Sequence, residues 1–249
     1  MRLLLINPNT TVAMTDQVLG MARQVVAPDT ELLGVTARFG ATVIASEASY
    51  AIAAHAALDA WARSAASVDA VVLACFGDPG LDALRELSAV PVVGLAEASI
   101  HAACQTGTRF GIVCGGARWA PMLRAFVAGR GLLGRLSGVH TVAPTGADIA
   151  RDPDGSLDGL AKACQDAAEA GAEVVILGGA GLAGLAPRLA PKVAVPLIDC
   201  VVTAINQAEA LARIRVGDTQ VGPTAGPAPC DYVGLSPELA ARLATPVHS

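Results

Sequence analysis

Short apolar runs alternate along the chain with longer segments in which apolar residues recur at helical spacing. The runs are rich in leucine and β-branched residues, which is typical of strands buried on both faces. They predict eight strands, over residues 2–7, 31–36, 70–75, 90–95, 109–114, 138–142, 173–177 and 195–199. The helical pattern lies between them, over residues 49–64, 119–129, 157–170 and 201–214. This alternation predicts an α/β fold built on parallel sheets.

The pattern repeats at an offset of about 105 residues. Residues 69–75 resemble 173–179, residues 90–93 resemble 195–198, and residues 2–6 resemble 109–113. The repeat predicts two pseudo-symmetric lobes, each a parallel sheet flanked by helices, with the active site in the cleft between them. We assign residues 1–96 and about 201–216 to the first lobe, 97–200 to the second, and 217–249 to a Gly/Pro-rich tail with one short helix that Ser236 caps. Residues 75 and 179 then end equivalent strands and face one cleft.

Composition narrows the class of protein. The chain has 249 residues, 53% of them apolar and 16% charged, so it is long enough for a sizeable core and too apolar to be disordered. The net charge of −5 argues against nucleic acid as a partner, which selects basic patches. No uninterrupted apolar stretch reaches the roughly 18 residues of a membrane span, and residues 3–6 are too short for a signal peptide. We expect a cytoplasmic protein that acts on a small-molecule substrate, with no membrane partner.

Among the six cysteines, Cys75 is the candidate catalytic residue. It ends the strand 70–75 and precedes a glycine-rich turn, in which Asp78 and Pro79 suit the N-cap and first position of a helix. Ligands bind at the carboxyl ends of parallel strands, and a helix N-terminus there favours a thiolate. The alternative is a buried structural cysteine.

Other candidates stand at other strand ends. Cys114 ends the strand 109–114 and is a possible second acid, and Cys200 ends the strand 195–199. Asn9 follows the first strand, where its amide either faces the cleft or serves a turn. The four histidines are isolated and no CxxC motif is present, so we predict no metal. The remaining cysteines are expected to fill the core or lie in the tail: Cys104, Cys164 and Cys230.

A GxGxxG pattern follows the strand 173–177. It consists of Gly179, Gly181 and Gly184, and Asp199 lies about 20 residues beyond its first glycine, as in the dinucleotide-binding fingerprint. That fingerprint normally opens the first βαβ unit, however, and residues 75–81, the repeat partner, lack it. Binding of a dinucleotide is therefore kept as an alternative.

Several segments resemble the aspartate/glutamate/hydantoin racemase superfamily, in its hydantoin and allantoin racemase branch. They include Leu-Ile-Asn-Pro-Asn-Thr-Thr over 5–11 and Cys-Phe-Gly-Asp-Pro-Gly-Leu over 75–81, together with residues 110–113, 118–122 and 195–199. The resemblance covers about residues 1–214 and implies a cofactor-independent, homo-oligomeric enzyme with two lobes. In this family two cysteines typically face each other across the substrate carbon, one removing a proton and the other returning one to the opposite face.

Two positions depart from the family pattern. Relatives carry Gly-Cys-Ala-Gly where residues 178–181 read Gly-Gly-Ala-Gly, so Gly179 occupies the position of the second catalytic cysteine. Relatives also carry two threonines, which hold substrate oxygens, where this chain has Cys114 and Gly115. The resemblance leaves Cys75 as the proton-transfer residue. It favours a hydantoin-like or carboxylate substrate held by these residues: Asn9, Phe76, Gly77, Gly115, Ala180 and Gly181.

Because glycine has no proton to give, several reactions stay open. Cys75 can form and reprotonate a carbanion α to a carbonyl, with Cys114, Cys200 or water in place of the missing thiol. Decarboxylation of a malonate-type acid needs one proton donor, and arylmalonate decarboxylases of this superfamily are similar in using one cysteine, in their second lobe. A cis-trans isomerase would use the thiol as a nucleophile. The last alternative is a catalytically impaired homologue that binds a small ligand.

Overall fold

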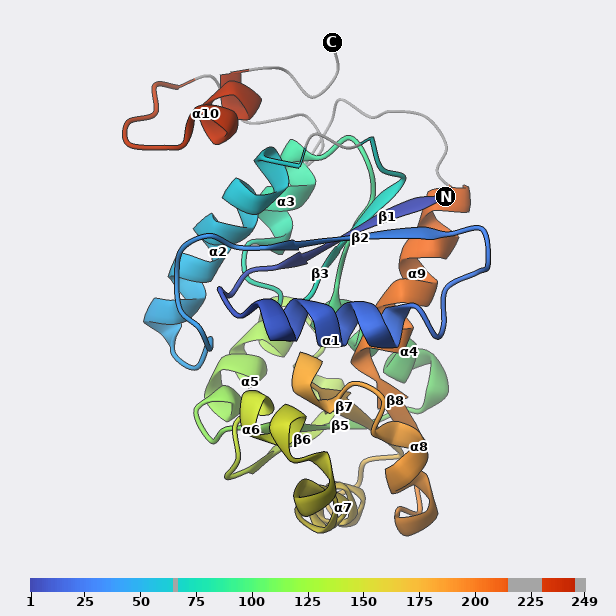
Figure 1. The fold of residues 1–249 in the computed structure, drawn as a ribbon. Helices are drawn as coiled ribbons and strands as arrows, with labels where there is room; N and C mark the ends of the chain where they lie inside the picture. The colour runs from blue at the N-terminus through green and yellow to red at the C-terminus, as the bar shows by residue number, and fades with distance from the viewer. Residues whose placement is uncertain (65–66, 215–229, 245–249) are drawn as a thin grey trace.

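Two four-stranded parallel sheets form the frame of the molecule (Figure 1). The computed structural model describes residues 1–64, 67–214 and 230–244. The first sheet has the order β2-β1-β3-β4 and consists of β1 (Arg2–Asn7), β2 (Glu31–Thr36), β3 (Ala70–Leu73) and β4 (Val92–Gly94). The second has the order β6-β5-β7-β8 and consists of β5 (Phe110–Gly115), β6 (Leu136–Val142), β7 (Val174–Gly178) and β8 (Leu197–Asp199). The same strand order in both sheets confirms the two-lobe α/β architecture expected from the repeat.

All eight predicted strands are present, with ends that shift by at most two residues. In β3, β5 and β7 every residue is buried, and in β1 every residue after the first is buried. Helices cover both faces of each sheet, so these strands have no polar face and their sequences are unbroken apolar runs.

The predicted helical segments correspond to α2 (Glu47–Ala62), α5 (Trp119–Gly129), α7 (Pro153–Glu169) and α9 (Cys200–Ile214). Five further helices are α1 (Val12–Ala22), α3 (Leu81–Leu87), α4 (Leu95–Thr106), α6 (Gly146–Arg151) and α8 (Ala186–Leu189). Within the described residues, none of the helices combines the length and apolar character needed to cross a membrane.

Helices α4 and α9 join the two lobes. α4 follows β4 of the first sheet and packs against β7 of the second, whereas α9 follows β8 of the second sheet and packs against β3 of the first. The two helices also pack against each other, and one apolar core runs through both lobes. In Figure 1, α9 extends from the lower sheet up the side of the upper one. The assignment of chain segments to lobes stays a prediction, since both helices belong to a shared core.

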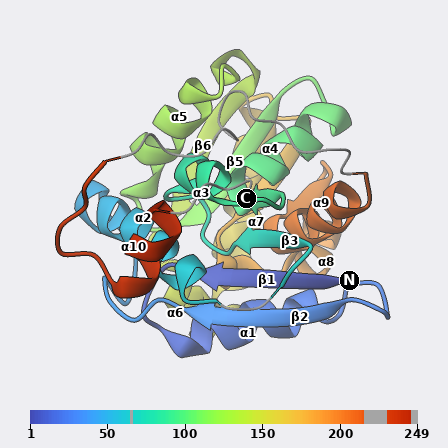
Figure 2. The ribbon, with the colours of Figure 1, turned by 90° about the horizontal axis from the view of Figure 1, so that it is seen from above.

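The predicted tail helix is α10 (Pro237–Ala244). It begins where expected, because the N–H of Leu239 donates to Oγ of Ser236 at 3.3 Å. Figure 2 shows α10 beside α2, where Leu239 is buried and the guanidinium of Arg242 lies 5.0 Å from the ring centre of Trp61. Residues 217–229 and 245–249 of the predicted tail lie outside the described residues.

The loop after β3 differs from its prediction. Asp78 and Pro79 do not begin the next helix. That helix, α3, starts at Leu81, and Gly80 before it has a left-handed backbone conformation with φ of +82°. Asp78 itself adopts a left-handed conformation with φ of +55°. Asp78, the predicted N-cap of α3, therefore has a different structural role.

The carboxylate of Asp78 caps α4. It accepts the backbone N–H groups of Ala96 at 2.9 Å and Glu97 at 2.8 Å, which have no partner within the first turn of their own helix. The N-cap residue of α4 is Gly94, and a Cβ at that position would lie 2.2 Å from Cγ of Asp78. Gly94 therefore leaves the space that the carboxylate fills. At the start of α9, the N-cap residue Asp199 supplies the carboxylate itself.

Replacing Gly94 with alanine tests this cap. The new Cβ collides with the Asp78 carboxylate, so we expect Gly94→Ala to lower the free energy of unfolding by about 2 kcal/mol or more. Gly159→Ala is the matched control, because Gly159 lies inside α7 with open space around its Cα. That control should raise stability by about 0.5–1 kcal/mol. Urea unfolding measures both, and equal effects of the two substitutions would contradict the assigned cap.

Candidate active site

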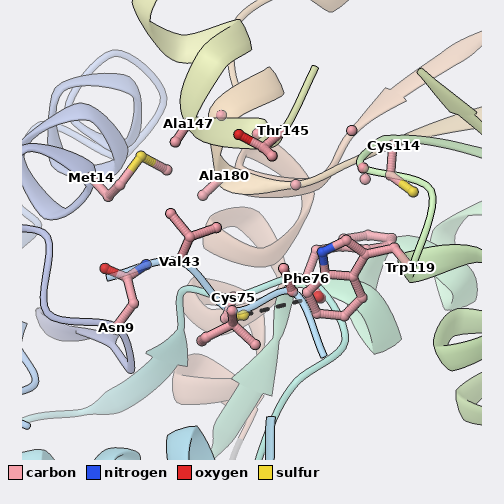
Figure 3. A pocket seen from close by; sticks show the side chains of 18 of the residues that line it. Asn9, Met14, Val43, Cys75, Phe76, Cys114, Trp119, Thr145, Ala147 and Ala180 are labelled. Carbon is pink, nitrogen blue, oxygen red and sulfur yellow. Dashed lines mark hydrogen bonds between the residues drawn. The ribbon is translucent and has the colours of Figure 1, made fainter. Parts of the chain in front are cut away.

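A cavity of about 90 Å³ lies where the carboxyl ends of the two sheets meet (Figure 3). This is the place where parallel α/β sheets bind ligands. Loops that follow strands of both lobes supply most of its wall: residues 9, 42–45, 74–76, 114–116, 145–147 and 178–181. Three apolar side chains complete it: Met14, Trp119 and Leu123.

Cys75 lies in the first-lobe wall of this cavity. It stands two residues beyond β3 and its residue exposure is 9%. Ile44 and Ala53 pack against it, and its carbonyl oxygen accepts the N–H of Asp78 at 3.0 Å. The thiol is therefore held by a packed loop at the edge of the cavity.

The protonation state of Cys75 differs from the expectation. Burial raises the pKa of the Cys75 thiol well above its usual range, and the nearby Asp78 carboxylate raises it further. The expectation that a helix N-terminus would favour the thiolate was wrong. The predicted helix, α3, begins only at Leu81, and the helix N-terminus that Asp78 meets is that of α4, which its carboxylate occupies. Both effects favour the neutral thiol.

Gly179 lines the same cavity from the second lobe, directly after β7. An added Cβ would find its nearest neighbour at 3.5 Å, which is Cδ1 of Leu182, so a side chain has room. The backbone φ of +138° is nevertheless a conformation that residues other than glycine rarely adopt. The structure thus brings Cys75 and the position of the missing second cysteine into one cavity.

Of the two other strand-end cysteines, Cys114 is the better placed. It pairs with Gly178 in the register of β5 and β7 and lines the cavity. Figure 3 shows it on a different wall from Cys75. Burial raises the pKa of Cys114 to about 12. Cys200, at the first position of α9, is fully buried beneath the backbone of Gly179 and is not part of the cavity wall.

Asn9 serves both functions that the sequence left open. Its Oδ1 accepts the N–H of Thr11 at 2.8 Å and Nδ2 of Asn7 at 3.0 Å, which makes it a turn residue. These two bonds occupy its oxygen and leave the amide nitrogen facing the cavity (Figure 3). Buried Asn7 fixes this orientation through a further bond from its Nδ2 to Oγ1 of Thr15.

Four of the remaining predicted binding residues line the cavity: Phe76, Gly115, Ala180 and Gly181. Two of these need to be glycine. A Cβ on Gly181 would lie 1.9 Å from the carbonyl oxygen of Gly146, and one on Gly115 would lie 2.7 Å from that of Pro144. Backbone of different loops therefore approaches closely around the cavity.

Gly77 does not reach the cavity, contrary to prediction. It lines a neighbouring hollow, and its carbonyl oxygen accepts the hydroxyl of Tyr50 at 2.5 Å. The indole of Trp119 packs over it, and a Cβ at Gly77 would lie 2.7 Å from that ring. Its φ of +110° turns the chain away from the cavity directly after Phe76. Gly77 is a turn residue.

Sequence reasoning missed several wall residues. Residues 145–147 follow β6, so the strand-end rule could have found them. Trp119 belongs to the segment 118–122 that resembles the racemase family, but nothing in that pattern marked it as a site residue. Residues 42–45 lie in the loop after β2, so the strand-end rule points to them as well, although no motif marks them. Met14 carries no sequence signal, because it lies on a helix that tertiary packing alone places at the cavity.

The GxGxxG pattern does not form a dinucleotide fingerprint. Residues 180–182 form a single 3₁₀ turn instead of opening a long helix, and the next helix, α8, has four residues. The carboxylate of Asp199 accepts the N–H of Gly184 at 2.6 Å and caps α9, so it is not free for a ribose. Among the described residues, no cluster of three or more His, Cys, Asp or Glu side chains could hold a metal ion.

Comparisons with known proteins agree with this geometry. A family model described as Asp/Glu/Hydantoin racemase matches residues 3–208. A hydantoin racemase of Paenarthrobacter aurescens is 37% identical over 217 residues, which are 86% of this chain and 92% of that protein.

Two solved structures are similar over almost their whole length. The allantoin racemase of Klebsiella pneumoniae has a TM-score of 0.88 and 34% identity, with coverage of 96% of this chain and 98% of that one. The allantoin racemase of Pseudomonas fluorescens has a TM-score of 0.89 and 31% identity, with coverage of 94% and 100%. The chain therefore belongs to the Asp/Glu/hydantoin racemase family, in its hydantoin and allantoin racemase branch, and is an enzyme of the racemase type.

Proposed function

We propose that this enzyme forms and reprotonates a carbanion α to a carbonyl group in a small hydantoin-like or carboxylate substrate, without a cofactor. Cys75 is the proposed proton-transfer group. The observation that carries the proposal is the position of its thiol, in the wall of a cavity built by the strand ends of both lobes. Relatives named hydantoin racemase and allantoin racemase support the substrate class.

The lining of the cavity favours a neutral ring. None of the described residues that line it carries a formal charge, and its polar side chains carry amide, hydroxyl, thiol and indole N–H groups: Asn9, Thr42, Thr145, Cys75, Cys114 and Trp119. A free amino acid would bring an ammonium and a carboxylate, each of which is costly to desolvate without a charged partner. A hydantoin brings neutral amide N–H and C=O groups, which backbone and Asn9 can match.

Proton transfer at Cys75 serves one face of the substrate carbon. Once the Cys75 proton has passed to solvent water, the thiolate takes the α-proton, and the C–H electron pair moves onto the carbonyl to give an enolate. Backbone N–H groups in the wall at residues 76 and 180–181 are the proposed donors to its oxygen. Return of the proton from the same sulfur restores the starting configuration, since Gly179 on the second-lobe side has no proton to deliver. Inversion requires a proton from Cys114 or from water.

The neutral thiol favours decarboxylation as a second candidate. Loss of CO₂ from a malonate-type acid breaks a C–C bond and leaves the electron pair on the α-carbon, so no base is needed. The Cys75 Sγ–H then protonates that carbon, and water restores the thiol. Burial and the Asp78 charge, which raise the pKa of Cys75, hold it in the form that this reaction uses.

Isotope exchange separates these possibilities. For a 5-substituted hydantoin in D₂O, we expect the enantiomer whose C–H faces Cys75 to exchange its proton with retained configuration, and its mirror image to exchange far more slowly. Proton NMR measures exchange and circular dichroism measures inversion. Cys75→Ser should lower the exchange rate by roughly 10²–10⁴-fold, because serine is a poor acid and base.

Each other outcome of this experiment has a definite meaning. Inversion as fast as exchange would show a second acid at the cavity. Binding of hydantoins without exchange would show an impaired homologue, and rapid CO₂ release from aryl- or alkylmalonates would show a decarboxylase. Full turnover by Cys75→Ser would remove Cys75 from the mechanism in every case.

Substitution of Gly179 tests the opposite face. Gly179→Cys places a thiol where a side chain has room, and we expect inversion at least about tenfold faster than in Gly179→Ser. The serine variant is the control, because it carries the same backbone strain of about 1–3 kcal/mol without an acidic thiol. Both variants should therefore lose similar thermal stability. Equal inversion rates would contradict a proton path between positions 75 and 179.

A further inference from the structure

We propose that Asp78 is a positioning residue for Cys75: its carboxylate fixes the Cys75 loop to the N-terminus of α4 and so sets the surroundings of the thiol. The inference rests on the proposed role of Cys75. Its test measures the reactivity of the Cys75 thiol and not turnover, so this inference and the proposed function can fail separately.

Asp78 connects the Cys75 loop to α4 with three hydrogen bonds. Its own N–H donates to the Cys75 carbonyl at 3.0 Å, and its carboxylate accepts from Ala96 at 2.9 Å and Glu97 at 2.8 Å. The residue is 2% exposed. A change at this one side chain therefore reaches the loop that carries the thiol.

The backbone at Asp78 indicates that this connection is enforced. Among the described residues other than glycine, Asp78 alone has a positive φ, +55°. Such a conformation is unfavourable for a residue with a Cβ and persists where surrounding contacts determine it. The contacts here are the two bonds to α4 and the space that Gly94 leaves for the carboxylate. The positive φ of Asp78, the cap of α4 and the glycine at position 94 are therefore all explained by the Asp78 carboxylate.

The charge of Asp78, and not just its hydrogen bonds, distinguishes it from an ordinary cap. An open helix N-terminus carries partial positive charge and stabilises a nearby thiolate. A carboxylate placed on that N-terminus opposes this effect of the helix dipole. The pKa directions agree with this geometry, since the Asp78 charge raises the pKa values of both Cys75 and Tyr50.

Other charged and titratable groups around Asp78 are mostly paired with each other. Glu97 pairs with Arg85 and with Arg130, and Arg130 also pairs with Asp82 at 3.0 Å. Burial raises the pKa of Asp78 to about 7, although its bonds to α4 and the charge of Arg85 lower it. Other charged and titratable groups interact with Asp78 or with its charged neighbours. They lie on or directly beside α2, α3, α4, α5 and α9: Glu47, Tyr50, Asp82, Arg85, Glu97, His101, Arg130 and Cys200.

The experiment follows the alkylation rate of Cys75 by iodoacetamide against pH, with the modified peptide quantified by mass spectrometry. In Asp78→Asn the thiol loses the charge that Asp78 carries above about pH 7, so the pKa of the thiol in that range should fall. Each unit lowered should speed alkylation roughly threefold below the thiol pKa, because tenfold more thiolate is partly offset by a weaker nucleophile. Asp199→Asn is the matched control, since it removes the carboxylate from the cap of α9 but not from the side of Cys75. In Asp199→Asn the alkylation rate of Cys75 should stay within about twofold of the wild-type rate at each pH.

The wild-type profile supplies a second measurement if Asp78→Asn does not fold. As pH rises through about 7, Asp78 ionises and makes the thiol harder to deprotonate. The logarithm of the rate should therefore rise with unit slope, flatten near that pH, and rise again. A straight line of unit slope, or Asp78→Asn and Asp199→Asn variants that lose stability alike without moving the Cys75 profile, would overturn the proposal.

Discussion

The structure depends on two buried carboxylates that begin the helices between the lobes. Helices α4 and α9 each pack on the sheet of the other lobe, so their N-termini lie inside the molecule. Unpaired N–H groups at such a place are costly, and a carboxylate satisfies them and also neutralises the helix dipole. Asp78 does this for α4 and Asp199 for α9. These contacts hold the strand-end loops in the positions from which they line the cavity.

The same contacts determine what Cys75 can do. A thiol beside an open helix N-terminus would ionise easily, but the carboxylate that completes α4 also acts on the sulfur. Burial and that charge favour a neutral thiol at rest, in a cavity whose described wall residues carry no formal charge. Chemistry that begins with a protonated sulfur therefore fits the free site, while proton abstraction requires the substrate to change the surroundings of Cys75.

The sequence predicted what local patterns and the internal repeat encode. Strands such as β3 and β7 are predictable because they are buried on both faces, and the internal repeat predicts that Cys75 and Gly179 face one cavity. The N-cap prediction for Asp78 failed because local rules pair a cap with the next helix, whereas this carboxylate caps a helix that begins at Leu95. Met14 was missed for a related reason, since only tertiary packing brings its helix to the cavity.

Because the two lobes are pseudo-symmetric, the lobe that carries the thiol determines which face of the substrate carbon receives a proton. Both lobes end their third strand at the cavity, and each places a backbone loop there that can approach one face of a planar carbanion. A thiol in the first lobe delivers its proton to one face, and a thiol at the position of Gly179 would deliver it to the other. The two lobes have the same strand order, but one contributes a sulfur to the described wall and the other a glycine with φ of +138°. A reaction that passes through a planar carbanion here should therefore give one enantiomer, unless Cys114 or water reaches the face that Gly179 leaves open.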